Sequence, residues 1–125
     1  MVSKKLLSHN FYLEFIVNEN DWCSIFLGYN NKIKFLGADT LEIVIRKILS
    51  ILDTNSFPEP SYTLHGKLYY LFIALFEKHT VGYARVISPG IEIHFRDVLN
   101  QPIVTVFLSH QERQIWKNTL ENMIE

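Results

Sequence analysis

The chain has 125 residues, 48% of them hydrophobic and 14% aromatic, which is enough apolar material for one hydrophobic core in a single domain spanning residues 1–125. Twelve basic residues nearly balance thirteen acidic ones, and the net charge of −1 provides no field that would attract nucleic acid or an anionic membrane. Composition and charge therefore argue against a disordered chain, a nucleic-acid-binding protein and a membrane-surface protein.

The N-terminal segment, the apolar runs and the cysteine content bear on the cellular location of the protein. Residues 1–9 carry two lysines but only the apolar pair Leu6-Leu7, which is shorter than the apolar region of a signal peptide. The longest apolar run, Leu68–Phe76, has about half the length of a membrane-spanning helix. The single cysteine, Cys23, forms no intramolecular disulfide and is expected to be a small buried side chain. We expect a cytoplasmic protein without a membrane span, whose residues 1–9 form a flexible segment.

Three strands joined by short turns are predicted first. Over Phe11–Val17 the apolar residues Phe11, Leu13, Phe15 and Val17 alternate with Tyr12, Glu14 and Ile16, the period of a half-buried strand. Asn18–Asp21 has turn composition, and Trp22–Gly28 is the second predicted strand. Tyr29–Lys32 predicts a tight hairpin, because asparagine tolerates positive φ, and Ile33–Leu36 is the returning strand.

A helix is predicted to follow these strands. Asp39–Glu42 has the spacing of a capping box, with a carboxylate at the cap and a glutamate three residues later. The apolar residues of segment 41–52 fall on one broad arc, and only Ile43 lies on the polar side. Glu42 and Arg46 have the favourable i,i+4 spacing of an ion pair. The pattern indicates a helix that packs one face against a sheet.

Four further strands are predicted after the loop Asp53–Ser61. They span Lys67–Glu77, Thr80–Ile87, Ile91–Asp97 and Ile103–Leu108. The first of them is apolar on both faces, which is typical of an interior strand covered on both sides. Turn residues at Ser88–Gly90 and Asn100–Pro102 separate the last three strands.

The chain is predicted to end in a second helix. Ser109–Glu112 has the capping-box spacing, and an apolar stripe follows at Trp116, Leu120, Met123 and Ile124. The predicted order is β-β-β-α-β-β-β-β-α. Runs of strands separated by helices favour an α+β fold, in which a mainly antiparallel sheet of about six to seven strands packs with two helices.

Sequence motifs for catalysis, cofactors and metals are missing. No two of the five histidines stand at i,i+2 or i,i+4, and the chain has no HExxH, GxSxG, GxGxxG or Walker loop. We therefore expect that the protein binds no cofactor and no metal, and the same absence favours a protein that is not an enzyme.

One predicted strand face nevertheless holds candidate catalytic or binding residues. Glu92, His94 and Arg96 alternate with apolar residues along Ile91–Asp97 and share one face. General acid–base catalysis uses such groups. Neighbours on one strand face stand about 7 Å apart, however, so the pattern equally fits a solvent face with cross-strand charge pairing. A functional role requires a concave pocket that converges on these side chains.

Two hypotheses for function remain. The first is a small non-catalytic protein-binding or regulatory domain, such as an inhibitor, an immunity-type protein or an adaptor. A protein partner or a second copy of the chain would then cover its apolar strands. The alternative is a small enzyme or ligand-binding protein that uses Glu92, His94 and Arg96. The sequence identifies no partner or ligand.

Overall fold

Two antiparallel sheets and two helices make up the fold. The computed structural model describes residues 2–53, 62–64, 67–76, 80–87, 90–97, 99 and 101–124. The first sheet has the strand order β1-β2-β3-β4 and the second the order β5-β6-β7-β8-β9. Their bounds are β1 (Val2–Leu7), β2 (Phe11–Val17), β3 (Trp22–Tyr29), β4 (Lys32–Thr40), α1 (Leu41–Leu52), β5 (Tyr62–Leu64), β6 (Lys67–Phe76), β7 (Thr80–Ile87), β8 (Gly90–Asp97), β9 (Pro102–Ser109) and α2 (His110–Met123). The predicted α+β class is confirmed.

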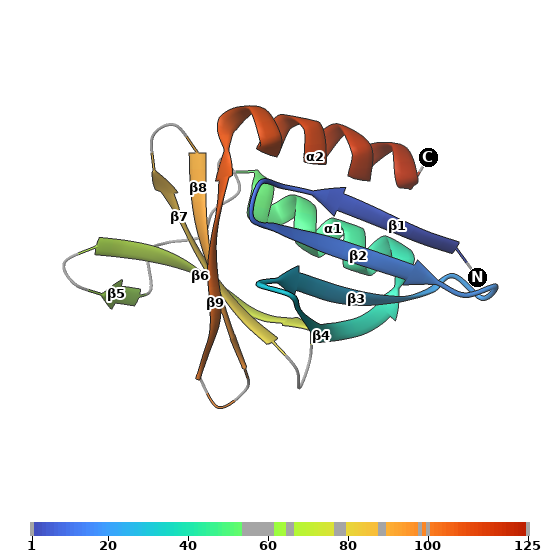
Figure 1. Ribbon diagram of the computed structural model, residues 1–125, viewed down its shortest axis with the longest axis horizontal. Coiled ribbons are helices and arrows are strands. Elements are labelled where there is room, and N and C mark those ends of the chain that lie inside the picture. Colours follow the sequence, from blue (N-terminus) through green and yellow to red (C-terminus); the bar gives the residue numbers. More distant parts are fainter. Residues whose placement is uncertain are drawn as a thin grey trace.

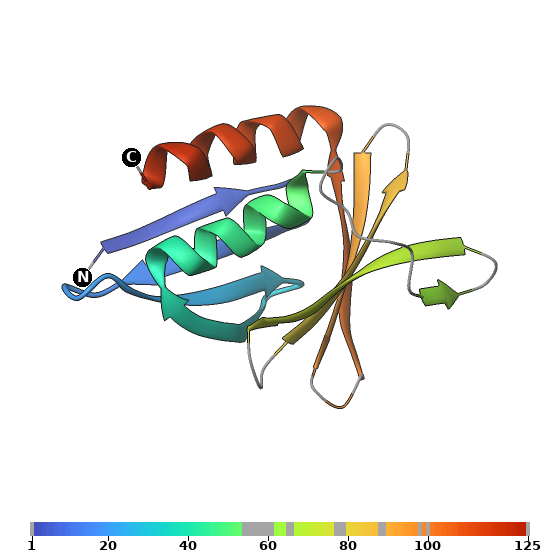
Figure 2. The same ribbon diagram turned by 180° about the vertical axis from the view of Figure 1, so that it is seen from behind.

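The seven predicted strands are all present, but the arrangement corrects the expectation of one sheet. Two additional strands, β1 and β5, bring the sheets to four and five strands. Helix α1 separates the strands β1 to β4 from the strands β5 to β9 along the chain, and each described strand pairs only with the strands next to it in sequence. Figures 1 and 2 show the two sheets at a steep angle, with α1 on one face of the first sheet and α2 beside β1.

Residues 2–7 form strand β1 instead of the flexible segment expected over residues 1–9. The strand pairs with β2 along its whole length, from Val2 opposite Val17 to Leu7 opposite Tyr12. Only Leu6 of this edge strand is buried. Because an edge strand with one buried residue needs little apolar sequence, the segment VSKKLL shows no clear apolar alternation. The strand forms a hairpin with β2, and its end also contacts the distant helix α2, where the Trp116 indole N–H donates to the Leu7 carbonyl.

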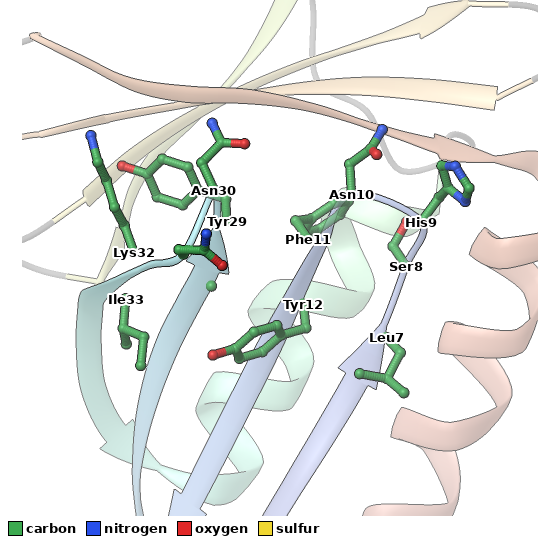
Figure 3. A pocket seen from close by; sticks show the side chains of 12 residues that line it. Leu7, Ser8, His9, Asn10, Phe11, Tyr12, Tyr29, Asn30, Lys32 and Ile33 are labelled. Carbon is green, nitrogen blue, oxygen red and sulfur yellow. The ribbon is translucent and has the colours of Figure 1, made fainter.

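The hairpin between β3 and β4 has the predicted conformation. Asn30 and Asn31 have φ angles of 47° and 61°, as a two-residue turn with both central residues at positive φ requires. Tyr29 and Lys32 form the pair that closes the hairpin. Its tip and the turn at Ser8–Asn10 lie at the same end of the first sheet, below β9 (Figure 3).

The predicted capping box of α1 is wrong. The N-cap is Thr40, whose side chain makes no capping hydrogen bond. Asp39 still belongs to β4, opposite Cys23, and its carboxylate accepts a hydrogen bond from the Thr40 backbone N–H at 2.7 Å. Strand β4 extends to Thr40 rather than ending at Leu36, so the cap shifts by one residue and Glu42 is no longer three residues after it.

The other features predicted for α1 are confirmed. Arg46 donates to the Glu42 carboxylate at 2.8 Å, and Ile43 is exposed on the polar side. The apolar face is buried against the first sheet. Buried side chains of both sheets and both helices form one cluster: Leu6, Phe11, Leu13, Phe15, Cys23, Ile25, Leu27, Leu36, Val44, Ile45, Ile48, Ile51, Leu52, Ala84, Ile91, Ile93, Phe95, Val106, Leu108, Trp116 and Leu120. Burial raises the pKa of the Cys23 thiol to about 11, which keeps it protonated and unreactive.

Strand β6 lies between β5 and β7, the interior position predicted for it. Its side chains, the strand end at Glu77 and the turn residues Ser88, Pro89 and Asn100 lie outside the described residues, as does most of the loop predicted at Asp53–Ser61. No helix in the described part of the chain is long and apolar enough to cross a membrane.

The capping box of α2 is confirmed. The Ser109 hydroxyl accepts from the Glu112 backbone N–H, and the Glu112 carboxylate accepts from the Ser109 N–H, both at 3.1 Å. The carboxylate also accepts from the Ser8 hydroxyl at 2.6 Å and from the His9 N–H at 3.2 Å. Burial opposes ionisation, but the hydrogen bonds from Ser8, Ser109 and His9 outweigh it and lower the pKa of Glu112 below its ordinary value of 4.5.

We predict that Glu112→Gln lowers the free energy of unfolding by about 1 kcal/mol at neutral pH, because the hydrogen bonds lose their charged acceptor. The folded-state pKa is depressed, so this stabilisation is present above the unfolded-state pKa and is lost as the pH falls through the folded-state pKa. Urea unfolding of both forms at several pH values measures the difference, with the exposed Glu121→Gln as control. A difference that stays constant down to strongly acidic pH would contradict the proposed linkage.

Candidate functional site

The structure brings two of the three predicted site residues into contact. His94 Nε2 lies 2.8 Å from Glu92 Oε1, and the two side chains are 17% and 20% exposed. On the other side of the ring, His94 Nδ1 lies 3.1 Å from Thr105 Oγ1. The two side chains close the roughly 7 Å spacing of neighbours on one strand face. Arg96 lies further along β8, at the register position opposite Val81 and Pro102.

Thr105 was not identified from the sequence. It belongs to β9 and stands directly opposite His94 in the register of β8 and β9. The signal that would have found it is cross-strand pairing, since facing residues have their Cβ atoms about 4.5–5.5 Å apart. The predicted strands were correct, but the sequence does not specify their register.

Carboxylate, imidazole and hydroxyl therefore stand in series on the face of β8 and β9. When the Glu92 carboxylate accepts the proton on Nε2, Nδ1 is the acceptor for the Thr105 hydroxyl. A base held by a carboxylate and bonded to a hydroxyl is the arrangement that activates hydroxyl nucleophiles. The same hydrogen bonds would also hold three polar side chains in place on a strand face that has no catalytic role.

A hollow of about 350 Å³ lies between β9 and the tips of the two turns of the first sheet. We call it the β9 groove; its lining consists of Asn10, Phe11, Tyr29, Asn30, Glu92, Val104, Thr105, Val106 and Phe107. Of the three residues predicted from the sequence, it includes Glu92; His94 and Arg96 are not among its described lining. The pocket required for a catalytic role thus reaches the ends of the series, Glu92 and Thr105, but not the imidazole between them.

Strand β9 forms one wall of the groove and is the last strand of its sheet. Within the described residues, no strand pairs with its second side. From Val104 to Ser109 it pairs regularly with β8 and contains no charged residue. Val106 is buried, whereas Phe107 is 42% exposed. The strand therefore presents a regular uncharged edge next to the groove.

The edges of the first sheet differ from that of β9. Strand β1 carries Lys4 and Lys5, and α2 lies beside it (Figure 1). Strand β4 carries Lys32 and Lys34. Its register with β3 shifts by one residue after Phe35, because Phe26 pairs with Phe35 and Ile25 pairs with Gly37. Lysines and irregular register are common means by which proteins prevent edge-to-edge association. The described part of β9 has neither between Val104 and Ser109.

A second hollow, of about 440 Å³, lies at the same end of the first sheet. Its lining includes Leu7, Tyr12 and Ile33, which belong to the sheet face opposite α1 (Figure 3). The Tyr12 ring lies directly over Gly28, where any side chain would collide with it. Both hollows share Asn10, so they adjoin at the turns.

The described residues contain no group of three histidine, cysteine, aspartate or glutamate side chains that could hold a metal ion. His9 and His110 lie near the beginning of α2, while His65 and His79 fall outside the described residues. No protein-family model matches the chain, and no curated protein is similar to it at a significant level.

Proposed function

We propose that this protein is a non-catalytic protein-binding domain that holds an extended segment of a partner protein in the β9 groove. The observation that carries the proposal is the uncharged edge of β9, from Val104 to Ser109, beside a hollow of about 350 Å³. A regulatory protein, an inhibitor or an adaptor would use such a groove to recognise its partner.

The backbone of β9 defines the shape of the partner. An edge strand has a row of N–H and C=O groups that point away from its sheet, and another extended chain satisfies them by adding as a further strand. The β-branched residues of β9 favour this extended conformation, and no bulge interrupts it after Val104. Backbone hydrogen bonds would supply affinity without requiring a particular partner sequence.

The side chains around the groove define the chemistry of the partner. Asn10 and Asn30 extend from the two turns toward β9 (Figure 3), and each carboxamide offers both a donor and an acceptor, as a peptide group does. Phe107, which is 42% exposed, and the largely buried Phe11 are the two phenylalanines of the same lining. An added strand places alternate side chains beside Phe107 and toward Phe11, so the partner segment should carry apolar residues at every second position.

The alternative function, a small enzyme or ligand-binding protein, is favoured by the series Glu92–His94–Thr105. Its terminal carboxylate and hydroxyl both line the groove. A bound substrate would thus meet the Thr105 hydroxyl. We give the binding domain preference because the long edge of β9 forms one side of the hollow, whereas the imidazole lies outside its lining.

Selection of linear peptides from a random display library on the purified chain tests the proposal. We expect the selected peptides to share alternating apolar residues and to bind at least about tenfold more weakly to Phe107→Lys, because a lysine at an edge opposes strand addition. Val86→Lys on β7 is the matched control, since Val86 is also an exposed apolar strand residue, and it should bind normally. Equal binding to Phe107→Lys and the wild type would contradict the proposal.

The same variants separate the two functions. In a binding domain, His94→Gln should leave peptide affinity unchanged within about twofold, because the imidazole lies outside the lining of the groove. An enzyme would hydrolyse an activated ester and lose that activity in both His94→Gln and Thr105→Ala. That result, together with no peptide selected by the wild type, would replace the first function by the second.

A further inference from the structure

We propose that the outer face of the first sheet, the face of β1 to β4 opposite α1, is a homodimer interface on which two copies of the chain pack sheet against sheet. This inference goes beyond the proposed function, because it concerns another surface and another partner. It starts from the residues that this face exposes.

The outer face is apolar although no described element covers it. An antiparallel sheet that buries one face normally alternates apolar residues inside with polar residues outside. Here the outward side chains include Leu7 and Ile33, which are 68% and 66% exposed, and Trp22 and Phe35, which are 47% and 37% exposed. In Figure 1 the strands β1 to β3 lie in front of α1, and no other element lies in front of them. A second surface is therefore needed to remove these side chains from water.

The charges of the face favour a second copy as that surface. In a two-fold interface the same patch meets itself, so unbalanced charges would repel. The alternation of the strands places two charged side chains on this face, Lys5 and Glu14, and the register puts them opposite each other. Lys5 Nζ lies 4.8 Å from the centre of the Tyr12 ring, and Glu14 accepts from Ser3 Oγ at 2.8 Å. The face is thus neutral, and the net charge of −1 opposes pairing of whole chains only weakly.

The shape of the outer face is also self-complementary, as a two-fold interface requires. Leu7 stands opposite Tyr12 on β2, and Gly28 stands opposite both Tyr12 and Ile33, so these four residues form one row across the sheet. The exposed ends of the row are Leu7 and Ile33, and the hollow of about 440 Å³ lies between them over Tyr12 and Gly28. A two-fold axis parallel to the strands, between β2 and β3, places β1 over β4 of the second copy. Leu7 then meets Ile33 of the second copy, and the centre of the row meets itself.

The edge strands of this sheet disfavour association edge to edge, so two copies would associate through their sheet faces. Lys4 on β1 and Lys32 and Lys34 on β4 oppose the addition of a strand at either side. Two sheets that pack face to face keep their strands within about 30° of each other, and their side chains interdigitate. Exposed aliphatic and aromatic side chains on a neutral sheet fit this packing.

The molar mass of the purified chain in solution tests the interface, by light scattering or sedimentation over a wide range of concentrations. We expect the wild type to have twice the chain mass of 14.7 kDa and both Ile33→Asp and Leu7→Asp to have the mass of one chain. Val86→Asp, which also charges an exposed strand residue but on β7, should remain a dimer. Circular dichroism verifies folding, and Ile33→Ser replaces any aspartate variant that does not fold.

Disulfide cross-linking tests the arrangement. The double variant Leu7→Cys, Ile33→Cys should form a covalent dimer under mild oxidation, and each single variant should form less, because Leu7 meets Ile33 of the second copy. Cys23 does not compete, since it is fully buried and its thiol stays protonated. A wild type with the mass of one chain would overturn the proposal, as would a dimer that persists in both aspartate variants or fails to cross-link. Peptide binding and its loss in Phe107→Lys are measured separately, so each proposal can fail alone.

Discussion

Replacing Phe15 by alanine should lower the free energy of unfolding by about 3–5 kcal/mol, the range for a buried phenylalanine truncated to alanine. Phe15 lies in the middle of β2, is fully buried and stands opposite Ile25 on β3. Its ring belongs to the core cluster between the first sheet and α1, so the variant leaves a cavity that the surrounding backbone cannot close. Urea unfolding followed by circular dichroism measures the change.

The control for Phe15→Ala is Ile115→Ala in α2. Ile115 is 56% exposed and lies outside the apolar stripe of the helix, so its loss should change the free energy of unfolding by less than about 0.5 kcal/mol. Similar losses in the two variants would show that β2 does not occupy the centre of the core.

Trp116→Ala should have an effect of similar size, about 3–5 kcal/mol. Trp116 is 3% exposed, its ring lies 5.4 Å from that of Phe11, and its indole N–H donates to the Leu7 carbonyl at 2.9 Å. It therefore connects α2 to the end of β1. We expect the variant to increase hydrogen exchange of the β1 amides more than that of the β3 amides.

A graded substitution separates the packing of Trp116 from its hydrogen bond. Trp116→Phe keeps an aromatic ring beside Phe11 but removes the donor to Leu7, so it should cost less than Trp116→Ala, with about 1 kcal/mol from the lost hydrogen bond. Unchanged exchange in β1 after Trp116→Ala would contradict the role given to this side chain.

The two proposed surfaces meet at the turns of the first sheet. Asn10, Phe11, Tyr29 and Asn30 line both the β9 groove and the hollow beside the outer face. A partner segment in the groove would therefore contact the rim of the dimer interface. Both turns are held by defined local structure, since Asn30 and Asn31 adopt positive φ and the Ser8 N–H donates to the Phe11 carbonyl at 2.9 Å.

Local signals in the sequence account for most of the individual elements. The alternation over Phe11–Val17, the asparagines at 30 and 31 and the capping box at Ser109 each depend on residues within a few positions, and all three predictions are confirmed. The predicted Asp39–Glu42 box fails because the end of β4 depends on its pairing with β3, and Asp39 still pairs with Cys23.

The sequence also identified part of the candidate site. The sequence pattern predicted that Glu92, His94 and Arg96 share one strand face. In β8 their neighbours Ile91, Ile93 and Phe95 are buried on the other face, as this alternation requires. It did not indicate Thr105, the contact between Glu92 and His94, or the groove. These depend on the register of β8 with β9 and on the approach of the turns at residues 10 and 30.

The type and approximate bounds of most strands and both helices can be predicted from the sequence, because backbone propensity, alternation and capping act over short stretches of chain. The division of the strands into two sheets, the edge strand at residues 2–7 and the side chains that meet on β8 and β9 are visible only in the folded protein. These features depend on the pairing and register of whole strands rather than on local signals, and a shift of one residue in register would turn each side chain to the opposite face.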